Sequence, residues 1–305
     1  MHRLLPVFFL LLTGCATTQL PDLKNLYGVS QEYAEQPPVV LVHGVLGSRL
    51  DNPDTGAEVW PGSVTRLLFH DYTDLALTID PDTLEPLPNK LEVAGITDRA
   101  AGRDFYGRII SVLEDVGGYV ASTPGTPASS RDRRFYVFTY DWRHDNIDAA
   151  AELDAFIEQI RADYDDPFLK VDLIAHSMGG LVARYYLRYG TTDVLDDNDF
   201  PVNYHGAERV RRVVLLGTPS VGAAKAVRVL MEGFKLGFGS VPPEAVLTFP
   251  STYQVLPHPL NNWLITMDGR PLERDVFSAE FWRRFEFSIF NEEVEQRVRG
   301  CGSTW

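Results

Sequence analysis

The chain has 305 residues, of which 45% are apolar, so it is long enough for a domain with a sizeable core. The 42 acidic residues outnumber the 28 basic ones, and the net charge of −14 argues against a nucleic-acid binder, which needs a basic face. Cys15 and Cys301 are the only cysteines, which excludes a disulfide framework and a cysteine-based zinc site.

The N-terminus predicts an export signal rather than a part of the fold. A short basic start is followed by an apolar run at residues 4–12, which has the length of a signal-peptide core and is too short to span a bilayer. The Leu-Thr-Gly-Cys motif that ends at Cys15 resembles the bacterial lipobox, whose cysteine is lipidated. We expect a lipoprotein signal peptide at residues 1–14 and a tether at residues 15–37, with Cys15 as the membrane anchor. An ordinary signal peptide is the alternative.

The residue after Cys15 is alanine rather than aspartate. In Gram-negative bacteria the lipobox resemblance therefore implies sorting to the outer membrane, with the protein on its periplasmic or surface side.

Four apolar, β-branched runs are predicted to be strands, and a polar turn follows each of them. They cover residues 38–42, 134–139, 171–175 and 210–216. Helical spacing of apolar residues occurs at 105–116, 147–164 and 181–189. This alternation predicts a doubly wound, mostly parallel sheet, in which ligands bind at the carboxyl ends of the strands. All four polar turns follow such ends.

Two stretches do not fit the alternation. We interpret residues 50–103 as an insertion, part lid and part binding surface, although a surface excursion without a role also fits. Residues 221–290 are interpreted as a second, cap-like insertion. Both belong to one predicted domain at residues 38–305.

The sequence Ala-His-Ser-Met-Gly around Ser177 is the strongest chemical signal. It matches a nucleophile elbow, in which small residues allow a sharp bend between a strand and a helix. The bend lifts the serine hydroxyl above the sheet edge and places the Met178 N–H at a helix start, where it favours an oxyanion. Ser177 is therefore the predicted nucleophile.

The second oxyanion donor is expected in the Gly-rich turn after the first strand, at residues 43–47. We predict the Val45 N–H for this role. His43 and His176 lie on tight turns beside the predicted site and are interpreted as structural residues rather than bases.

Four segments together resemble the lecithin:cholesterol acyltransferase family, which includes lysosomal phospholipase A2. They are His-Gly-x-Leu-Gly-Ser at 43–48, Tyr-Asp-Trp-Arg at 140–143, the elbow with a further glycine at 175–180, and Gly-Thr-Pro at 217–219. A Pro-Ser-x-Tyr-x-x-Leu-Pro segment at 250–257 is also similar.

The resemblance implies an α/β-hydrolase with a lid. It also implies attack by the serine on a phospholipid or acylglycerol ester, followed by acyl transfer to water or an alcohol, without metal or cofactor. Trp60 and Trp142 lie in segments that contribute to lipid handling in the family. The chain has no cysteine in the lid region, so the lid is expected to be looser or differently built than in the human members.

The acid and the base of a catalytic triad are not identifiable from the sequence. In this fold they follow the nucleophile in the order acid, then histidine. His205 precedes the fourth strand and is expected at the opposite end of the sheet. His258 and Asp268 are weak candidates, since His258 lies in the cap-like stretch and Asp268 precedes a glycine that is typical of a hairpin turn. The family's acid and histidine patterns do not occur, so we expect a truncated relative without its last core strands.

Two hypotheses follow. The first is a serine-dependent lipid acyl hydrolase or O-acyltransferase. The second is a catalytically impaired remnant or lipid-binding lipoprotein, whose open sheet would expose an apolar edge. Head-group preference, acyl-chain preference and oligomeric state follow from no pattern in the sequence.

Overall fold

The computed structural model describes residues 36–88, 90–100, 103–194, 199–236, 238–260, 262–272, 274–287 and 290–300. The predicted signal peptide, the predicted attachment site at Cys15 and most of the predicted tether lie outside these residues. Within them, no helix combines the length and the apolar character needed to cross a membrane.

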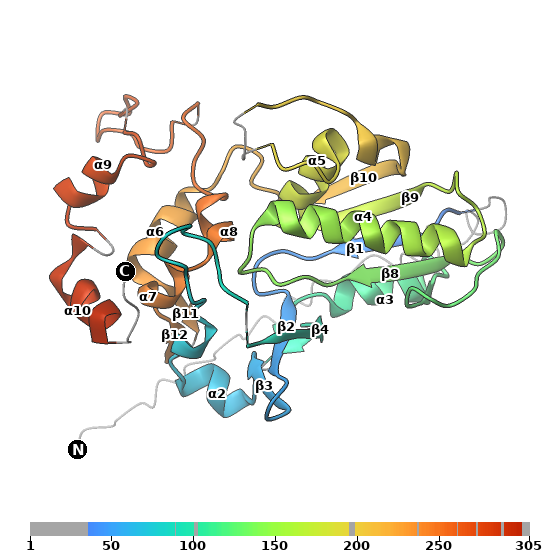
Figure 1. Cartoon of the computed structure of the whole chain (residues 1–305), viewed down its shortest axis with the longest axis horizontal. Coiled ribbons are helices and arrows are strands. Elements are labelled where there is room, and N and C mark those ends of the chain that lie inside the picture. The colour runs from blue at the N-terminus through green and yellow to red at the C-terminus, as the bar shows by residue number, and fades with distance from the viewer. Residues whose placement is uncertain are drawn as a thin grey trace, which may run out of the picture.

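A parallel sheet forms the centre of the molecule, with the strand order β10-β9-β1-β8-β7 (Figure 1). In register, Val42 pairs with Phe138 on one side and with Ala175 on the other, so the carboxyl ends of the central strands meet at one edge. The strands are β1 (Val39–Val42), β7 (Val120–Ala121), β8 (Arg134–Phe138), β9 (Val171–His176) and β10 (Val210–Leu216). The four predicted strands are present; β7 was not predicted, because two residues are too few for a pattern.

Helices cover the sheet on both faces because successive strand residues point to opposite sides. Val40 and Leu173 face the main core, which includes Leu153 of α4 (Asn146–Asp163) and Val182 of α5 (Gly179–Tyr189). On the opposite face, Val39 and Phe135 pack against Leu113 of α3 (Gly107–Asp115). These three helices correspond to the three helical patterns in the sequence, and the arrangement confirms the predicted doubly wound sheet.

The first stretch outside the alternation folds as a small antiparallel sheet with the order β3-β2-β4 and two short helices. It contains β2 (Ser48–Asn52), β3 (Ala57–Trp60), α2 (Val64–Phe69), the 3-10 turn η2 (Thr73–Leu75) and β4 (Glu92–Ile96). A two-stranded sheet follows, formed by β5 (Arg99–Ala100) and β6 (Arg103–Asp104).

The stretch after β10 is mainly helical and contacts that first insertion. The Phe238 N–H donates to the Leu68 carbonyl, and the Tyr72 N–H to the Ser240 carbonyl, so the β11–β12 hairpin packs on α2. In Figure 1, α9 and α10 lie on the far side of α6, α7 and α8 from the parallel sheet. The elements are α6 (Ala224–Glu232), β11 (Phe234–Leu236), β12 (Gly239–Val241), α7 (Pro243–Val246), α8 (Pro250–Tyr253), α9 (Ala279–Arg284) and α10 (Glu292–Gly300).

β10 forms one edge of the parallel sheet. In the described part of the chain no strand pairs with its outer side, and Val214 and Leu215 are 49% and 41% exposed. The short 3-10 turn η3 (His205–Glu208) precedes this strand. Arg211 and Arg212 of the same strand are also exposed, so the edge carries both charged and apolar side chains.

Candidate active site

Ser177 occupies the tight turn between β9 and α5. Its φ is +52°, a left-handed conformation that non-glycine residues rarely adopt. Its N–H donates to the Leu216 carbonyl at the end of β10, 2.9 Å away, which ties the turn to the neighbouring strand. This is the backbone geometry of a nucleophile elbow.

The glycines after the serine let the helix start approach two other chain segments. A Cβ on Gly179 would lie 2.2 Å from the His43 carbonyl oxygen, and a Cβ on Gly180 would lie 1.9 Å from Thr218 Oγ1. Neither position has space for a side chain. The elbow is therefore held by close packing against the turns that follow β1 and β10.

The turn after β1 lies directly against Ser177. The Gly47 N–H donates to the Gly44 carbonyl at 3.1 Å and closes this turn. A Cβ on Gly44 would be 2.7 Å from the Ser177 Cβ and 3.3 Å from the Met178 nitrogen. Gly44 thus adjoins both the predicted nucleophile and one predicted oxyanion donor.

Met178 and Val45 supply the two N–H groups that the sequence singled out. Met178 caps the N-terminus of α5 and is buried, while Val45 follows Gly44 in the turn. Neither N–H donates to another group within the described residues. The start of α5 adds a partial positive charge beside the Met178 N–H.

Tyr106 braces this turn, although no pattern in the sequence marked it. Its hydroxyl accepts from the Gly44 N–H at 2.8 Å and lies 2.9 Å from His176 Nδ1. The hydroxyl therefore links Gly44 to His176, and the tautomer of His176 sets which group donates in the second hydrogen bond. Burial raises the pKa of Tyr106 to about 12, which keeps the hydroxyl protonated.

His43 is fully buried and stacks on Tyr140, with ring centroids 4.3 Å apart. Its Nε2 accepts from the Tyr140 N–H at 3.2 Å, and its Nδ1 lies 2.8 Å from the Gly44 carbonyl. Burial lowers its pKa to about 4, so the ring is neutral near pH 7. Both ring nitrogens are committed to backbone groups, as the structural interpretation of His43 expected.

His176 is also committed to a partner. Its Nδ1 lies 2.9 Å from the Tyr106 hydroxyl, and burial lowers the pKa of His176 below its ordinary value. Both imidazoles beside the serine are therefore neutral and support the turn, and among the described residues neither forms a hydrogen bond with the Ser177 hydroxyl.

The Tyr-Asp-Trp-Arg segment ties the insertion to the sheet edge. Arg143 is fully buried and binds the Asp141 carboxylate through Nε and Nη2 at 2.9 and 2.6 Å. Its Nη1 donates to the Leu75 carbonyl of the insertion. Burial acts to raise the pKa of Asp141, but the Arg143 guanidinium holds it below its usual value. This carboxylate is therefore held as an anion by Arg143, and it also lies 3.6 Å from His144 Nε2.

The two tryptophans of the family-like segments hold the chain between the oxyanion turn and β2. Trp60 Nε1 donates to the Leu46 carbonyl, and Trp142 Nε1 to the Ser48 carbonyl. Their rings meet edge to face, 5.9 Å apart. They shape the turn that carries Val45.

The weak candidates for base and acid lie on turns with partners of their own. His258 is exposed, and its Nδ1 accepts from the Leu260 N–H. Asp268 is exposed in the turn before Gly269, and Thr266 and Arg270 bind its carboxylate and lower its pKa. This turn is the hairpin that the sequence favoured. Within the part of the chain that the structure describes, neither His258 nor Asp268 forms a hydrogen bond with Ser177.

His205 lies in η3, before β10, and its Nε2 is 3.0 Å from the Asp154 carboxylate. That is the amino end of the strand, as its position in the sequence predicted. In the described part of the chain, no group of three histidine, cysteine, aspartate or glutamate residues is arranged to hold a metal ion.

Comparison with known proteins identifies the matched segment. The lecithin:cholesterol acyltransferase family model matches residues 129–270. No curated protein matches this chain. Solved structures with similarity include the Tle4–Tli4 complex, at 18% identity over 87% of this chain and 66% of that chain, with a TM-score of 0.48. The lipase BlEst2 of Bacillus licheniformis in its mature form is similar at 15% identity over 72% of this chain and 57% of that chain, with a TM-score of 0.32.

The chain thus spans less than two thirds of the length of both solved chains. The match over residues 129–270 includes β8, β9, the elbow and β10. This segment is similar to the lecithin:cholesterol acyltransferase family, and the parallel sheet with its strand–turn–helix junction at Ser177 is the α/β-hydrolase fold that the motifs predicted.

Proposed function

We propose that this chain is a serine-dependent acyl hydrolase or O-acyltransferase that acts on phospholipid or acylglycerol esters. The observation that carries the proposal is the backbone at Ser177, with its φ of +52° and the oxyanion turn packed against it. Strain of this kind costs of order 1–3 kcal/mol and persists only where the surroundings enforce it. The similarity of residues 129–270 to an acyltransferase family supports an ester as the substrate.

In the proposed reaction, Ser177 Oγ attacks the ester carbonyl and forms a tetrahedral oxyanion. The N–H groups of Val45 and Met178 stabilise that charge, and removal of one such donor typically lowers kcat by about 100- to 1,000-fold. The alcohol leaves with a proton, and an acyl group remains on Ser177. Water then releases a fatty acid, or an alcohol takes the acyl group and forms a new ester.

In a complete triad a histidine takes the proton from the serine hydroxyl. Here His43 and His176 are neutral rings bound to other groups, so we expect water or hydroxide ion to take the proton from Ser177. A histidine base gives a rate that levels off above its pKa. Here the rate of acylation by a p-nitrophenyl ester should continue to rise between pH 6 and 9, by up to about tenfold per unit.

The test is the hydrolysis of p-nitrophenyl butyrate and p-nitrophenyl dodecanoate by the full chain and by Ser177→Ala. Loss of ester cleavage in Ser177→Ala supports the proposal. Equal cleavage by both proteins would overturn the nucleophilic role. A rate that levels off near pH 7 would show that one of the histidines acts as a base.

A second candidate is lipid binding without turnover. His43, His176, His258 and Asp268 each form hydrogen bonds with groups other than Ser177. This favours the second candidate, because none of these side chains is then placed to act as base or acid. Cys15→Ser protein should then bind phosphatidylcholine vesicles and leave their esters intact over hours. Release of fatty acid from those vesicles would exclude it.

The localisation belongs to the same proposal. We expect lipidation at Cys15 to hold the protein at the bacterial outer membrane. Mass spectrometry of the N-terminal peptide from native membranes tests this, because an unmodified Cys15 in the mature chain would contradict it.

A further inference from the structure

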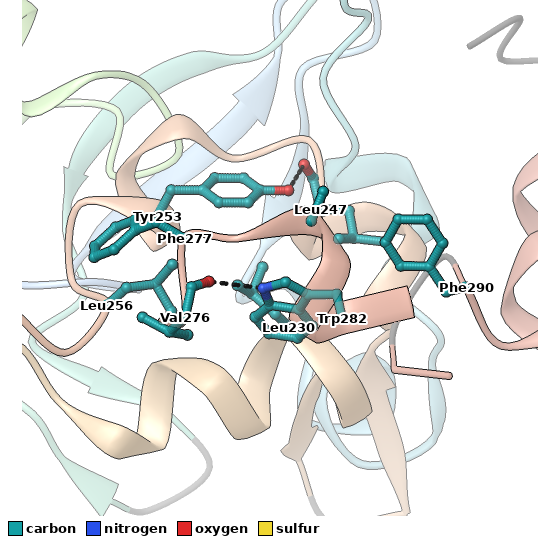
Figure 2. A pocket seen from close by; sticks show the side chains of 9 residues that line it. Leu230, Leu247, Tyr253, Leu256, Val276, Phe277, Trp282 and Phe290 are labelled. Carbon is teal, nitrogen blue, oxygen red and sulfur yellow. Dashed lines mark hydrogen bonds between the residues drawn. The ribbon is translucent and has the colours of Figure 1, made fainter. Parts of the chain in front are cut away.

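An apolar pocket lies outside the Ser177 turn, between α6, the α7–α8 region and the chain around α9. Figure 2 shows side chains from three separate segments pointing into it. Its volume is about 270 Å³. Its lining includes Leu230, Leu247, Leu256, Val276, Trp282 and Phe290.

The polar atoms in the pocket wall already have partners. The Tyr253 hydroxyl donates to the Leu247 carbonyl at 2.8 Å, and Trp282 Nε1 donates to the Val276 carbonyl at 2.7 Å (Figure 2). Since no charged side chain lines the pocket, it has nothing to offer a polar ligand. Whatever occupies it gains its affinity from the burial of apolar surface.

The volume restricts the shape of the occupant. Pockets for drug-sized ligands measure about 300–1,000 Å³. At about 270 Å³ the cavity suits one narrow chain and excludes a sterol or the two chains of a diacyl phospholipid together. An unbranched alkyl chain combines a small volume with the absence of polar atoms.

The pocket wall around Leu256 packs on the loop that follows β10, next to the candidate active site. A Cβ on Gly222 would lie 2.1 Å from the Leu256 carbonyl oxygen. The Ala223 N–H donates to the Val255 carbonyl, and the His258 N–H donates to the Val221 carbonyl. This loop follows directly from the strand end that accepts the Ser177 N–H.

The other wall comes from a part of the chain that the family match does not cover. Val276, Trp282 and Phe290 all lie beyond residue 270, where that match ends. The pocket therefore combines residues inside the matched segment with residues beyond it.

We propose that this pocket binds a single unbranched alkyl chain, either of a free fatty acid or of a one-chain lipid, with its polar end at the pocket mouth. The binding does not require turnover at Ser177. The two proposals are therefore tested separately. Cleavage of p-nitrophenyl esters at Ser177 tests the function, and alkyl binding by Ser177→Ala tests the pocket.

Trp282 provides the readout. Dodecanoic acid brominated near its methyl end should quench tryptophan fluorescence in full-length Cys15→Ser/Ser177→Ala protein, at concentrations below those at which the acid forms micelles. In the same protein with Trp282→Phe, the brominated acid should quench the remaining tryptophan fluorescence far less, while calorimetry still detects binding of the acid. Undiminished quenching without Trp282 would overturn the assignment of the site, as would the absence of any binding.

A pocket-filling variant tests the same site by a second route. Leu230→Trp should weaken dodecanoate binding by about tenfold or more, because added volume in a packed site is poorly accommodated. Leu260→Trp is the matched control, since Leu260 is 86% exposed and outside the pocket lining, and its affinity should be unchanged. Equal affinity in a folded Leu230→Trp protein would contradict the proposal. If that variant does not fold, the quenching experiment still decides.

Two ligands show whether the bound alkyl chain belongs to a free fatty acid or to a one-chain lipid. Dodecanoic acid tests for a fatty acid, and 1-dodecanoyl lysophosphatidylcholine tests for a one-chain lipid. Quenching competition by either supports the alkyl site, and the tighter ligand identifies the source. Competition by cholesterol at equal strength would overturn the shape argument.

Discussion

The turn at Ser177 and the turn at Asp268 were both candidates for catalytic roles, and they are built in opposite ways. Ser177 has a strained φ of +52° and lies against Gly44, while Gly179 beside it has no space for a Cβ. Gly269 also has a positive φ, of +82°, but nothing lies within 4 Å of its Cβ position. The first turn is enforced by the chain segments that follow β1 and β10, and the second by its own local hydrogen bonds, so only the first has the construction of a reactive site.

Replacing a glycine by alanine at each turn should give the largest difference in stability between the two turns. Gly179→Ala places a Cβ 2.2 Å from a backbone oxygen and should destabilise the fold by about 3 kcal/mol or more. Gly269→Ala should lower the free energy of unfolding by about 1 kcal/mol, which is the cost of a left-handed backbone conformation at a residue with a Cβ. Urea unfolding measures both values, and equal losses would mean that the two turns are held alike.

The pH dependence of stability should sharpen the comparison at His43. Its folded pKa of about 4 lies below the ordinary 6.5, so the unfolded chain binds the extra proton between these values. The neutral ring therefore contributes stability above pH 6.5, and this contribution, about 3 kcal/mol, is lost as the pH falls toward 4.

His43→Asn removes this titration. The free energy of unfolding should then fall less steeply between pH 7 and pH 5 than it does in the unchanged protein. Burial raises the pKa values of Asp148 and Glu152, which gives both proteins the same opposing slope. Parallel curves for the two proteins would contradict the assigned burial of His43.

Tyr106→Phe should have a smaller but more specific effect. It leaves the Gly44 N–H and His176 Nδ1 without their partner, at a cost of about 1–3 kcal/mol. The rate of Ser177 acylation should also fall, because the oxyanion turn loses its brace. Tyr253→Phe is the control, since it removes one hydrogen bond outside the turn and should leave that rate unchanged.

The smallest effects are expected at the two exposed candidates. His258→Ala should change the free energy of unfolding by no more than about 0.5 kcal/mol. Neither this substitution nor Asp268→Asn should alter the rate of Ser177 acylation. A tenfold loss of that rate in either variant would show that the substituted residue takes part in the reaction.

The sequence predicted those features that depend on a few consecutive residues. The elbow was recognisable because Ala175, Ser177 and Gly179 meet its steric demands within five positions. The hairpin at Gly269 was recognisable from the Asp-Gly pair alone.

The features that the sequence did not reveal join distant segments. Tyr106 contacts Gly44 and His176, which are 62 and 70 positions away, and no motif connects them. The alkyl pocket likewise combines Leu230 with Trp282 and Phe290. The two-residue strand β7 was too short to produce any periodicity.

The most direct test of the central claim, that the strained turn presents a reactive serine, is covalent modification of the protein by a fluorophosphonate probe, followed by peptide mapping. We expect one adduct, on Ser177, with a rate that rises with pH, and no adduct in Ser177→Ala. A protein that remains folded and acquires no adduct on Ser177 up to pH 9, or that is modified at another residue instead, would contradict the account.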